Sequence, residues 1–246
     1  MKESLVLIPT YNEAENITDI LQAVLDLPER FDVLVIDDGS PDGTQTLVER
    51  LQAEFPERIY LEKRTKKLGL GTAYIHGFKK ALEWGYQLIY EMDADFSHNP
   101  HDLLKLREAC LTEAHVAIGS RYSQGVNVVN WPISRVLLSY FASVYVRMVT
   151  RMPIHDATAG FKCYRRTVLE TLRLDKIRFV GYAFQIEMKY KSWLAGFRVV
   201  EVPIIFTDRT KGESKMSDAI IREAFFGVIS LRLRSGRRSK TRPLLT

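Results

Sequence analysis

Apolar and polar positions follow one another along this chain in blocks that predict alternating strands and helices. Four short apolar runs have the length and residue types of strands buried on both faces. They are residues 4–8, 32–36, 59–62 and 88–91. Between them, apolar residues recur at helical spacing over 14–27, 45–55 and 73–84. This β-α-β-α-β-α-β order predicts an α/β protein with a mostly parallel, doubly wound central sheet flanked by helices.

The second half of the chain continues the alternation less regularly. Its patterns predict helices at 101–111 and 183–194 and strands at 116–119, 198–202 and 204–206. A further helix, rich in Val, Leu, Tyr and Phe, follows Trp131-Pro132 and reaches about Met148, with its cations near its ends. This pattern is typical of a core helix by default, and alternatively of a helix that lies in a membrane interface with its apolar face down.

Composition narrows the class of protein. The chain has 246 residues, of which 46% are apolar and 26% charged, as in an ordinary globular protein. Cys110 and Cys163 have no metal-site or disulfide spacing, and no signal peptide or apolar run of about 20 residues is present, which favours the cytosol. The net charge of +5 indicates an anionic partner.

Two aspartates lie directly after the strand at 88–91. Ligands bind at the carboxyl ends of parallel strands, where Asp93 and Asp95 are expected. Alternate residues of an extended segment share a face, so the two carboxylates can converge on one hard cation. Mg²⁺ or Mn²⁺ would suit them, because such ions are often held by one or two carboxylates and substrate phosphates. Taken alone, the pair is equally typical of a solvated acidic turn.

Two earlier strand ends carry carboxylates of the same kind. Glu13 and Asp38 can accept hydrogen bonds from ribose hydroxyls or base N–H groups. The glycine-containing turns at 39–43 and 69–71 match neither the dinucleotide-binding motif nor the P-loop, so NAD and P-loop NTPase functions are poorly supported. The repetition of polar strand ends therefore predicts one nucleotide site with a metal ion.

In the second half of the chain, positively charged residues lie after the predicted strands and in the loop and tail that follow. Arg121 comes after the strand at 116–119, and Arg209 and Lys215 lie in a polar loop that suits a clamp over phosphate oxygens. The apolar segment at 220–233 leads into a wholly basic tail. The tail is either solvated or an anchor for an anionic membrane surface, and the neighbouring apolar helix favours the anchor.

No nucleic-acid-binding motif is present, and the aspartate pair lies too far along the chain for a haloacid-type phosphatase.

Several motifs in this order resemble the family 2 glycosyltransferases of GT-A (nucleotide-diphospho-sugar transferase) fold, and within them the polyprenol (dolichol) phosphate mannose synthases. The resemblance covers about residues 4–217. Its motifs are Pro9-Thr10-Tyr11-Asn12-Glu13, Asp37-Asp38-Gly39-Ser40, Met92-Asp93-Ala94-Asp95, Gly119-Ser120-Arg121-Tyr122, Asn130-Trp131-Pro132 and Asp208-Arg209 with Gly212-Glu213-Ser214-Lys215. The first three are shared widely in family 2, whereas the later ones are more particular to the polyprenol-phosphate branch.

The resemblance implies a role for each matching position. The nucleotide-sugar site would comprise Pro9, Tyr11, Glu13, Ile36, Asp38, Asp93, Ala94, Asp95, Arg209 and Lys215, with Asp93 and Asp95 as metal ligands. The lipid phosphate would be held by Arg121, Arg135 and Ser139. The catalytic residues would be Asp95, Arg121 and Arg209. The chemistry of the reaction, apart from the resemblance, adds Asp156 as a catalytic candidate that would accept a proton or orient a cation.

The implied reaction moves mannose from GDP-mannose to a polyprenyl (dolichyl or undecaprenyl) phosphate, with inversion at the anomeric carbon and Mg²⁺ or Mn²⁺ as cofactor. The alternative is the same mechanism with another donor such as UDP-glucose. Two departures from the family are expected to matter. Ser97 stands where some members carry a glutamine near the metal, and the C-terminal membrane-spanning helices of many relatives are missing.

These inferences divide the chain in two. Residues 1–217 are expected to form the GT-A catalytic domain, and residues 218–246 an amphipathic helix and basic tail that contact a membrane surface. The expected partners are GDP-mannose and polyprenyl phosphate, without nucleic acid. The expected location is peripheral, on the cytoplasmic face of the membrane.

Overall fold

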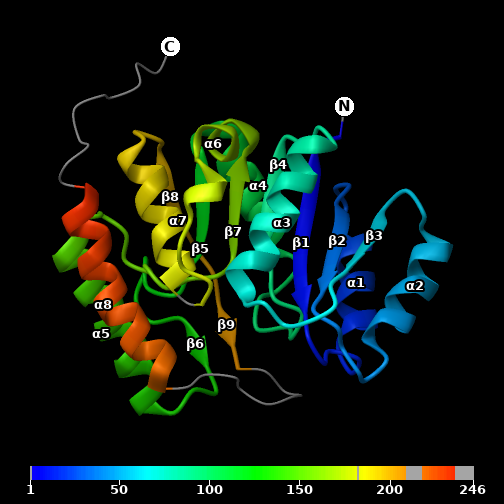
Figure 1. Cartoon of the computed structure of the whole chain (residues 1–246), viewed down its shortest axis with the longest axis horizontal. Helices are drawn as coiled ribbons and strands as arrows, with labels where there is room; N and C mark the ends of the chain where they lie inside the picture. Colours follow the sequence, from blue (N-terminus) through cyan, green and yellow to red (C-terminus); the bar gives the residue numbers. More distant parts are fainter. Residues whose placement is uncertain (1, 182, 209–217, 236–246) are drawn as a thin grey trace.

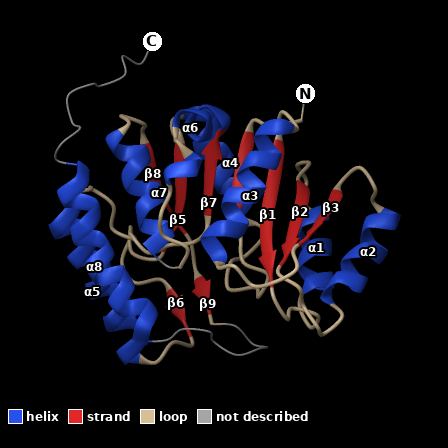
Figure 2. Cartoon of the chain, viewed as in Figure 1, coloured by secondary structure: helices blue, strands red, loops and turns tan. Residues whose placement is uncertain are grey.

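A central sheet lies between two layers of helices in the computed structural model of the chain (Figure 2). The structure describes residues 2–181, 183–208 and 218–235. Its strands are β1 (Ser4–Thr10), β2 (Asp32–Asp37), β3 (Ile59–Lys63), β4 (Leu88–Glu91), β5 (Val116–Ser120), β6 (Val128–Val129), β7 (Lys162–Arg165), β8 (Val199–Pro203) and β9 (Phe206–Thr207). Its helices are α1 (Ile17–Leu25), α2 (Thr44–Glu54), α3 (Leu70–Glu83), α4 (Asp102–Thr112), α5 (Ile133–Thr150), α6 (Arg166–Thr171), the short 3₁₀ helix η1 (Leu174–Lys176), α7 (Ala183–Leu194) and α8 (Asp218–Ser235).

The described strands form a seven-stranded sheet in the order β3-β2-β1-β4-β7-β5-β8 (Figure 1). β1 pairs in parallel with β2 on one side and with β4 on the other, so the strand order reverses direction at β1. Ligands of open α/β sheets bind beside such a switch point, at the carboxyl ends of the strands. The topology therefore places the ends of β1, β2 and β4 at the edge predicted to hold a nucleotide.

The apolar runs are continuous because both faces of the sheet are covered. Leu5 and Leu7 of β1 face a core built with α3, α6 and α7, while Val6 and Ile8 face a core built with α1, α2 and α4. A fully buried Val, Leu or Ile side chain stabilises a fold by about 1.5–3 kcal/mol.

One strand departs from the parallel arrangement. β7 runs antiparallel between β4 and β5, and joins two groups of strands that do not pair with each other directly. The turn that precedes β7 therefore lies at the same edge as the carboxyl ends of β4 and β5. A small second sheet, in which β6 pairs in parallel with β9, lies beyond this edge (Figure 1). The sequence pattern did not predict β6.

The helix expected after Trp131 forms as α5, and the interpretation of it as a core helix holds for one side only, where Val146 joins the core. Ile133, Leu137, Phe141 and Met148 lie on one stripe and are all exposed, Met148 by 74%. The inner side of α5 packs against α8, where the Tyr145 ring stacks on the Phe225 ring with 4.6 Å between ring centroids. Within the described ranges, no helix has both the length and the apolar character needed to cross a bilayer.

Helix α8 belongs to the same folded unit as the sheet. Val228 is 1% exposed and, with Leu231, joins the core formed by α3, α6 and α7. Gly227 lies so close to Phe179 that an added Cβ would come within 2.8 Å of the ring, so only glycine allows this approach. The opposite stripe of α8, Phe226, Ile229 and Leu233, is exposed.

Candidate active site

The two aspartates after β4 differ in their surroundings. Asp95 is buried, and its Oδ1 accepts a hydrogen bond from the backbone N–H of Ser97 at 3.1 Å. Asp93 is more open, with 42% of its side chain exposed. Phe96 has a φ of 58°, a backbone conformation that non-glycine residues rarely adopt and that is most often found where function requires it. The chain thus turns sharply and presents both carboxylates at the carboxyl edge of β4.

The residues beside this pair fit a divalent cation. The buried Ser97 Oγ and His98 Nδ1 have no hydrogen-bond partner among the described residues, and Nδ1 lies 3.8 Å from Asp93 Oδ2. Burial lowers the pKa of His98 to about 4, so the ring is neutral near pH 7. The described residues contain no group of three or more His, Cys, Asp or Glu side chains placed for a metal. Two carboxylates that leave the remaining positions to phosphate oxygens suit Mg²⁺ or Mn²⁺.

The loop after β1 is fastened to the loop after β2. The backbone N–H of Asn12 donates to Ser40 Oγ at 2.9 Å, and that of Glu13 donates to Thr44 Oγ1 at 3.1 Å. The Lys67 ammonium lies 4.8 Å from the centroid of the Tyr11 ring. These contacts bring the predicted nucleoside-binding residues Tyr11 and Glu13 to the same edge as the end of β2.

The side chain of Asp38 is held by two contacts from the segment that follows β3. Its carboxylate lies 3.2 Å from Arg64 Nη1 and accepts a hydrogen bond from the Leu68 backbone N–H at 3.4 Å. Burial raises the pKa of Asp38, and the charge of Arg64 opposes that rise. Of the other predicted donor-site residues, Pro9 is half-buried at the end of β1. The Ile36 and Ala94 side chains are buried in the two cores, which leaves only their backbone to contact a ligand.

Arg121 follows β5 and is locked to Asp156, which lies in the turn before β7. Its Nε donates to Asp156 Oδ2 at 2.7 Å and its Nη2 to Oδ1 at 2.6 Å. Nη2 also donates to Thr158 Oγ1 at 2.8 Å, and the Arg121 backbone N–H donates to Asp156 Oδ2 at 2.9 Å. This bidentate pair fixes the orientation of the guanidinium group.

Asp156 is therefore suited to orienting a cation. Burial alone would raise its pKa, but the charge and hydrogen bonds of Arg121 outweigh burial and hold the pKa below its usual value. Both carboxylate oxygens accept hydrogen bonds from Arg121. Of the two roles expected for Asp156, the geometry favours the one in which it orients Arg121 over the one in which it accepts a proton.

An aromatic cluster joins the cations to the carboxylates. The Phe206 ring of β9 packs edge-on against His98 at 5.3 Å and against Trp131 at 5.1 Å between ring centroids. The Arg121 guanidinium lies 5.5 Å from the Phe206 ring and 5.4 Å from the Trp131 ring. Phe206 thus contacts both Arg121 and His98, and His98 Nδ1 lies 3.8 Å from Asp93 Oδ2. The sequence analysis missed Phe206, His98 and Thr158, since nothing in a local pattern shows that distant rings share one contact.

Of the remaining predicted site residues, the structure describes Arg135 and Ser139. Arg135 lies over the Trp131 ring at 4.1 Å, and its Nη1 donates to Asp208 Oδ1 at 2.8 Å. Ser139 lies one turn further along α5 and is half-buried. Arg209 and Lys215, predicted to clamp the diphosphate, lie outside the described residues.

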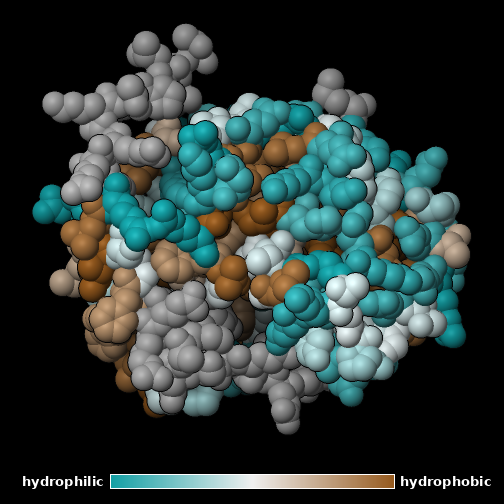
Figure 3. Space-filling model, viewed as in Figure 1, coloured by the Kyte–Doolittle hydropathy of each residue, from teal (hydrophilic) through white to brown (hydrophobic). Residues whose placement is uncertain are grey.

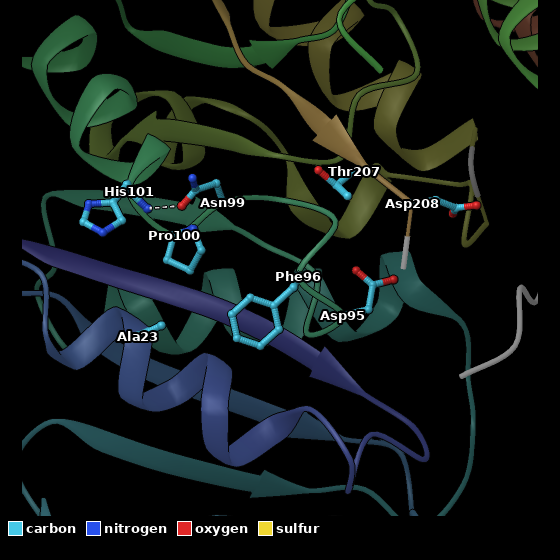
Figure 4. Close-up of a pocket in the computed structure, with 8 residues that line it drawn as sticks. All are labelled: Ala23, Asp95, Phe96, Asn99, Pro100, His101, Thr207 and Asp208. Carbon is cyan, nitrogen blue, oxygen red and sulfur yellow. Dashed lines mark hydrogen bonds between the residues drawn. The ribbon is translucent and has the colours of Figure 1, made fainter. Parts of the chain in front are cut away.

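A pocket of about 400 Å³ opens beside Asp95 (Figure 4). Asp95, Thr207 and Asp208 lie at one end of it, and Ala23 of α1 lies at the other. Asp95 is the only predicted site residue from the described ranges that lines it. The pocket therefore borders Asp95 of the aspartate pair, while the residues predicted to bind a nucleoside lie around the ends of β1 and β2.

A network of buried polar side chains lies on β4, β7 and α7. Lys162 Nζ lies 3.0 Å from Glu91 Oε2, and Gln185 Nε2 donates to the same oxygen at 2.8 Å. Burial lowers the pKa of Lys162, and Glu91 opposes that change. Lys189 is also buried and donates to the backbone carbonyl of Ala159 at 2.7 Å. The sequence analysis missed this network, although a glutamate inside an apolar strand signals a buried partner.

The chain matches the model of the family described as "Glycosyl transferase family 2" over residues 5–173. It is 46% identical to "Polyprenol monophosphomannose synthase" of Mycolicibacterium smegmatis, over 98% of this chain and 91% of that protein. It is also 46% identical to "Undecaprenyl-phosphate mannosyltransferase" of Micrococcus luteus, over 91% of each chain.

Among solved structures, the chain is similar to the mannosyltransferase PcManGT of Pyrobaculum calidifontis in complex with GDP-Man and Mn²⁺. The TM-score is 0.62 at 18% identity, over 98% of this chain and 65% of that one. At this identity the likeness concerns the fold alone, and it agrees with the expected α/β architecture with a mostly parallel central sheet flanked by helices.

Proposed function

The chain belongs to glycosyl transferase family 2, and we propose that it transfers mannose from GDP-mannose to a polyprenyl phosphate with inversion at the anomeric carbon. The observation that carries the proposal is that Phe206 contacts residues of both kinds of group, those of the aspartate segment and those around Arg121. His98, whose Nδ1 lies 3.8 Å from Asp93 Oδ2, packs against the Phe206 ring, and so does Arg121, which is paired with Asp156. The 46% identity to two proteins named for this type of acceptor and sugar supports it.

The proposed donor site lies at the ends of β1, β2 and β4. Glu13 and Asp38 accept hydrogen bonds from the nucleoside, and Tyr11 and the backbone at Pro9, Ile36 and Ala94 form its walls. Asp93 and Asp95 hold a divalent ion, which when bound neutralises the leaving diphosphate. Arg209 and Lys215 remain proposed diphosphate ligands outside the described residues.

The proposed acceptor site surrounds Arg121. This guanidinium group, oriented by Asp156 and Thr158, attracts the lipid phosphate, with Arg135 and Ser139 of α5 beside it. A phosphate oxygen attacks the anomeric carbon from the side opposite the diphosphate, so a bond to the sugar forms as the diphosphate leaves. The nucleophile is anionic near neutral pH, so no general base is required. Orientation and charge stabilisation carry the catalysis.

The decisive test offers purified protein a short polyprenyl phosphate with radiolabelled GDP-mannose, UDP-glucose or UDP-GlcNAc, each with Mg²⁺, Mn²⁺ or EDTA. We expect lipid-linked product from GDP-mannose, and a loss of about a hundredfold or more in EDTA, since metal ions supply several kcal/mol to such reactions. Product from UDP-glucose instead would keep the mechanism and replace the donor. The absence of transfer from every donor would contradict the proposal.

We further propose that the protein acts at the cytoplasmic face of a membrane as a peripheral protein, with residues 1–217 for catalysis and 218–246 for surface contact. The exposed apolar stripes of α5 and α8 support this proposal (Figure 3, left edge). Arg147, Arg151, Arg232 and Arg234 lie near the ends of these helices, and the basic tail follows. Cations attract anionic lipid, while apolar stripes enter the boundary with the acyl chains.

The double variant Leu137→Ser/Phe141→Ser is expected to bind vesicles at least about tenfold more weakly than wild type. Each of these side chains is exposed in the structure and would lose about 1.5–3 kcal/mol of burial in lipid. Flotation with vesicles of phosphatidylglycerol and phosphatidylcholine measures the binding. The matched control Leu111→Ser/Leu194→Ser alters exposed leucines on α4 and α7 and should bind as wild type does. Equal loss in both double variants would contradict the assignment.

A further inference from the structure

Glu201, at the centre of β8, is the common acceptor for two turns of the candidate site. Its Oε1 accepts hydrogen bonds from Ser120 Oγ and from the backbone N–H of Asp156, both at 2.8 Å. Its Oε2 accepts from the backbone N–H of His155 at 2.7 Å and lies 2.9 Å from His155 Nδ1. The side chain is only 10% exposed, so these protein donors take the place of water.

The first of these bonds continues into the turn that carries Arg121. Ser120 donates its hydroxyl proton to Glu201, and its Oγ accepts from the backbone N–H of Tyr122 at 3.2 Å and of Ser123 at 3.1 Å. Glu201 is thus connected to the backbone on both sides of Arg121. Through the backbone N–H of Asp156 it is connected equally directly to the residue that orients the Arg121 guanidinium.

We propose that Glu201 is a positioning residue: its carboxylate fixes the turn of Arg121 relative to the turn of Asp156, and so aims the guanidinium at the acceptor phosphate. The geometric part needs only the hydrogen bonds above. The part that concerns the phosphate rests on the function proposed for Arg121. Glu201 acts only through Ser120 and the 155–156 turn, and touches no reacting atom.

Only a carboxylate can serve all four donors. Each carboxylate oxygen accepts from two of them, whereas glutamine has one accepting oxygen and one NH₂ group that only donates. In Glu201→Gln, whichever position the NH₂ group takes, it faces a backbone N–H, that of Asp156 or that of His155, which then lacks an acceptor. The variant keeps the size of the side chain and removes half of its accepting capacity. We therefore expect local loosening of the two turns within an intact fold.

The first measurement follows the Arg121 side chain directly, without reference to catalysis. In ¹⁵N-edited NMR spectra, the Nε–H proton of Arg121 is bound to Asp156 and should exchange slowly with water; Arg121→Lys identifies its signal. Glu201→Gln is expected to raise its exchange rate by at least about tenfold, because hydrogen bonds to charged groups contribute enough for such a factor. The control Glu62→Gln removes a carboxylate of β3 that contacts His76 and Lys80, and should leave the exchange rate unchanged.

The second measurement compares substrates. Glu201→Gln is expected to raise the KM for a short polyprenyl phosphate by about tenfold and to change the affinity for GDP with Mn²⁺ less than threefold, because β1, β2 and β4 are untouched. Ser120→Ala, which removes one of the four bonds, should give a smaller effect of the same kind. Equal losses for both substrates would assign Glu201 a general structural role and overturn the inference.

The two proposals fail in different ways. Unchanged Arg121 exchange in Glu201→Gln overturns the positioning inference, whatever the enzyme does. Faster exchange, together with a wild-type protein that transfers no sugar to the lipid phosphate, overturns the proposed function while the geometric inference stands.

Discussion

Asp95→Ala is expected to lower the rate of sugar transfer by about a thousandfold while the protein keeps its fold. A bound metal ion stabilises transition-state charge by several kcal/mol, and each 1.36 kcal/mol is a factor of ten in rate. Asp95 lies after the end of β4, and its Oδ1 accepts a hydrogen bond from the Ser97 backbone N–H, within its own turn. Its loss should therefore affect the site far more than the core. Kinetics with GDP-mannose and Mn²⁺, together with the circular dichroism spectrum, measure the two effects.

The matched control is Asp26→Ala, at the exposed end of α1. It removes a carboxylate of the same kind and should transfer sugar at the wild-type rate. Turnover by Asp95→Ala within tenfold of wild type would refute the assignment of Asp95 as a metal ligand.

Asp156→Asn is expected to lower the free energy of unfolding by about 3 kcal/mol and to reduce transfer by at least a hundredfold. Removal of one member of a buried ion pair leaves the other charge without compensation, which typically costs 3–5 kcal/mol. Arg121 is only 10% exposed, so solvent cannot replace the lost carboxylate. Urea denaturation at pH 7 measures the stability, and the acceptor KM measures the orientation of Arg121.

The pH dependence of this difference has a definite sign. The folded-state pKa of Asp156 lies below the unfolded value of about 3.9, so the ion pair contributes fully above that pH and is lost as the pH falls through the folded pKa. The gap between wild type and Asp156→Asn should therefore be constant from pH 7 to about 5 and close below about 4. Glu113→Gln, which breaks an exposed pair with Arg198, should cost less than about 1 kcal/mol. A gap that widens in acid would contradict this account.

The first four strands and three helices were predictable because β1, β2 and β4 are buried on both faces, β3 is a short apolar run beside them, and each helix has one apolar side. Predicted and observed bounds agree there within a few residues: the strand expected at 4–8 runs over Ser4–Thr10, and the helix expected at 14–27 spans Ile17–Leu25. The polar strand ends were predictable for the same reason. Parallel strands of one sheet finish at one edge, so Asp38 and Asp93 had to lie at the same edge of the sheet.

The later elements resisted prediction because their environment depends on distant parts of the chain. The direction of β7 is set by its pairing with β4 and β5, and its four residues carry no pattern that distinguishes parallel from antiparallel. The apolar residues of α5 look like those of a core helix, and only the position of α8 shows which side is covered. The bidentate contact between Arg121 and Asp156 joins residues 35 apart, a separation that local spacing does not reveal.

The insertion of β7 between β4 and β5 has a consequence for the order in which the protein is made on the ribosome. β1 to β4 are complete once residue 91 has been synthesised, and each finds its neighbour among strands already present. β5 cannot join them, because its partner on that side is β7, more than forty residues later. Until then β4 and β5 have unpaired edges, which attract other chains and favour aggregation. The nascent chain therefore passes through a vulnerable stage, in which the free edge of β4 is covered only after the turn carrying Asp156 has been followed by β7.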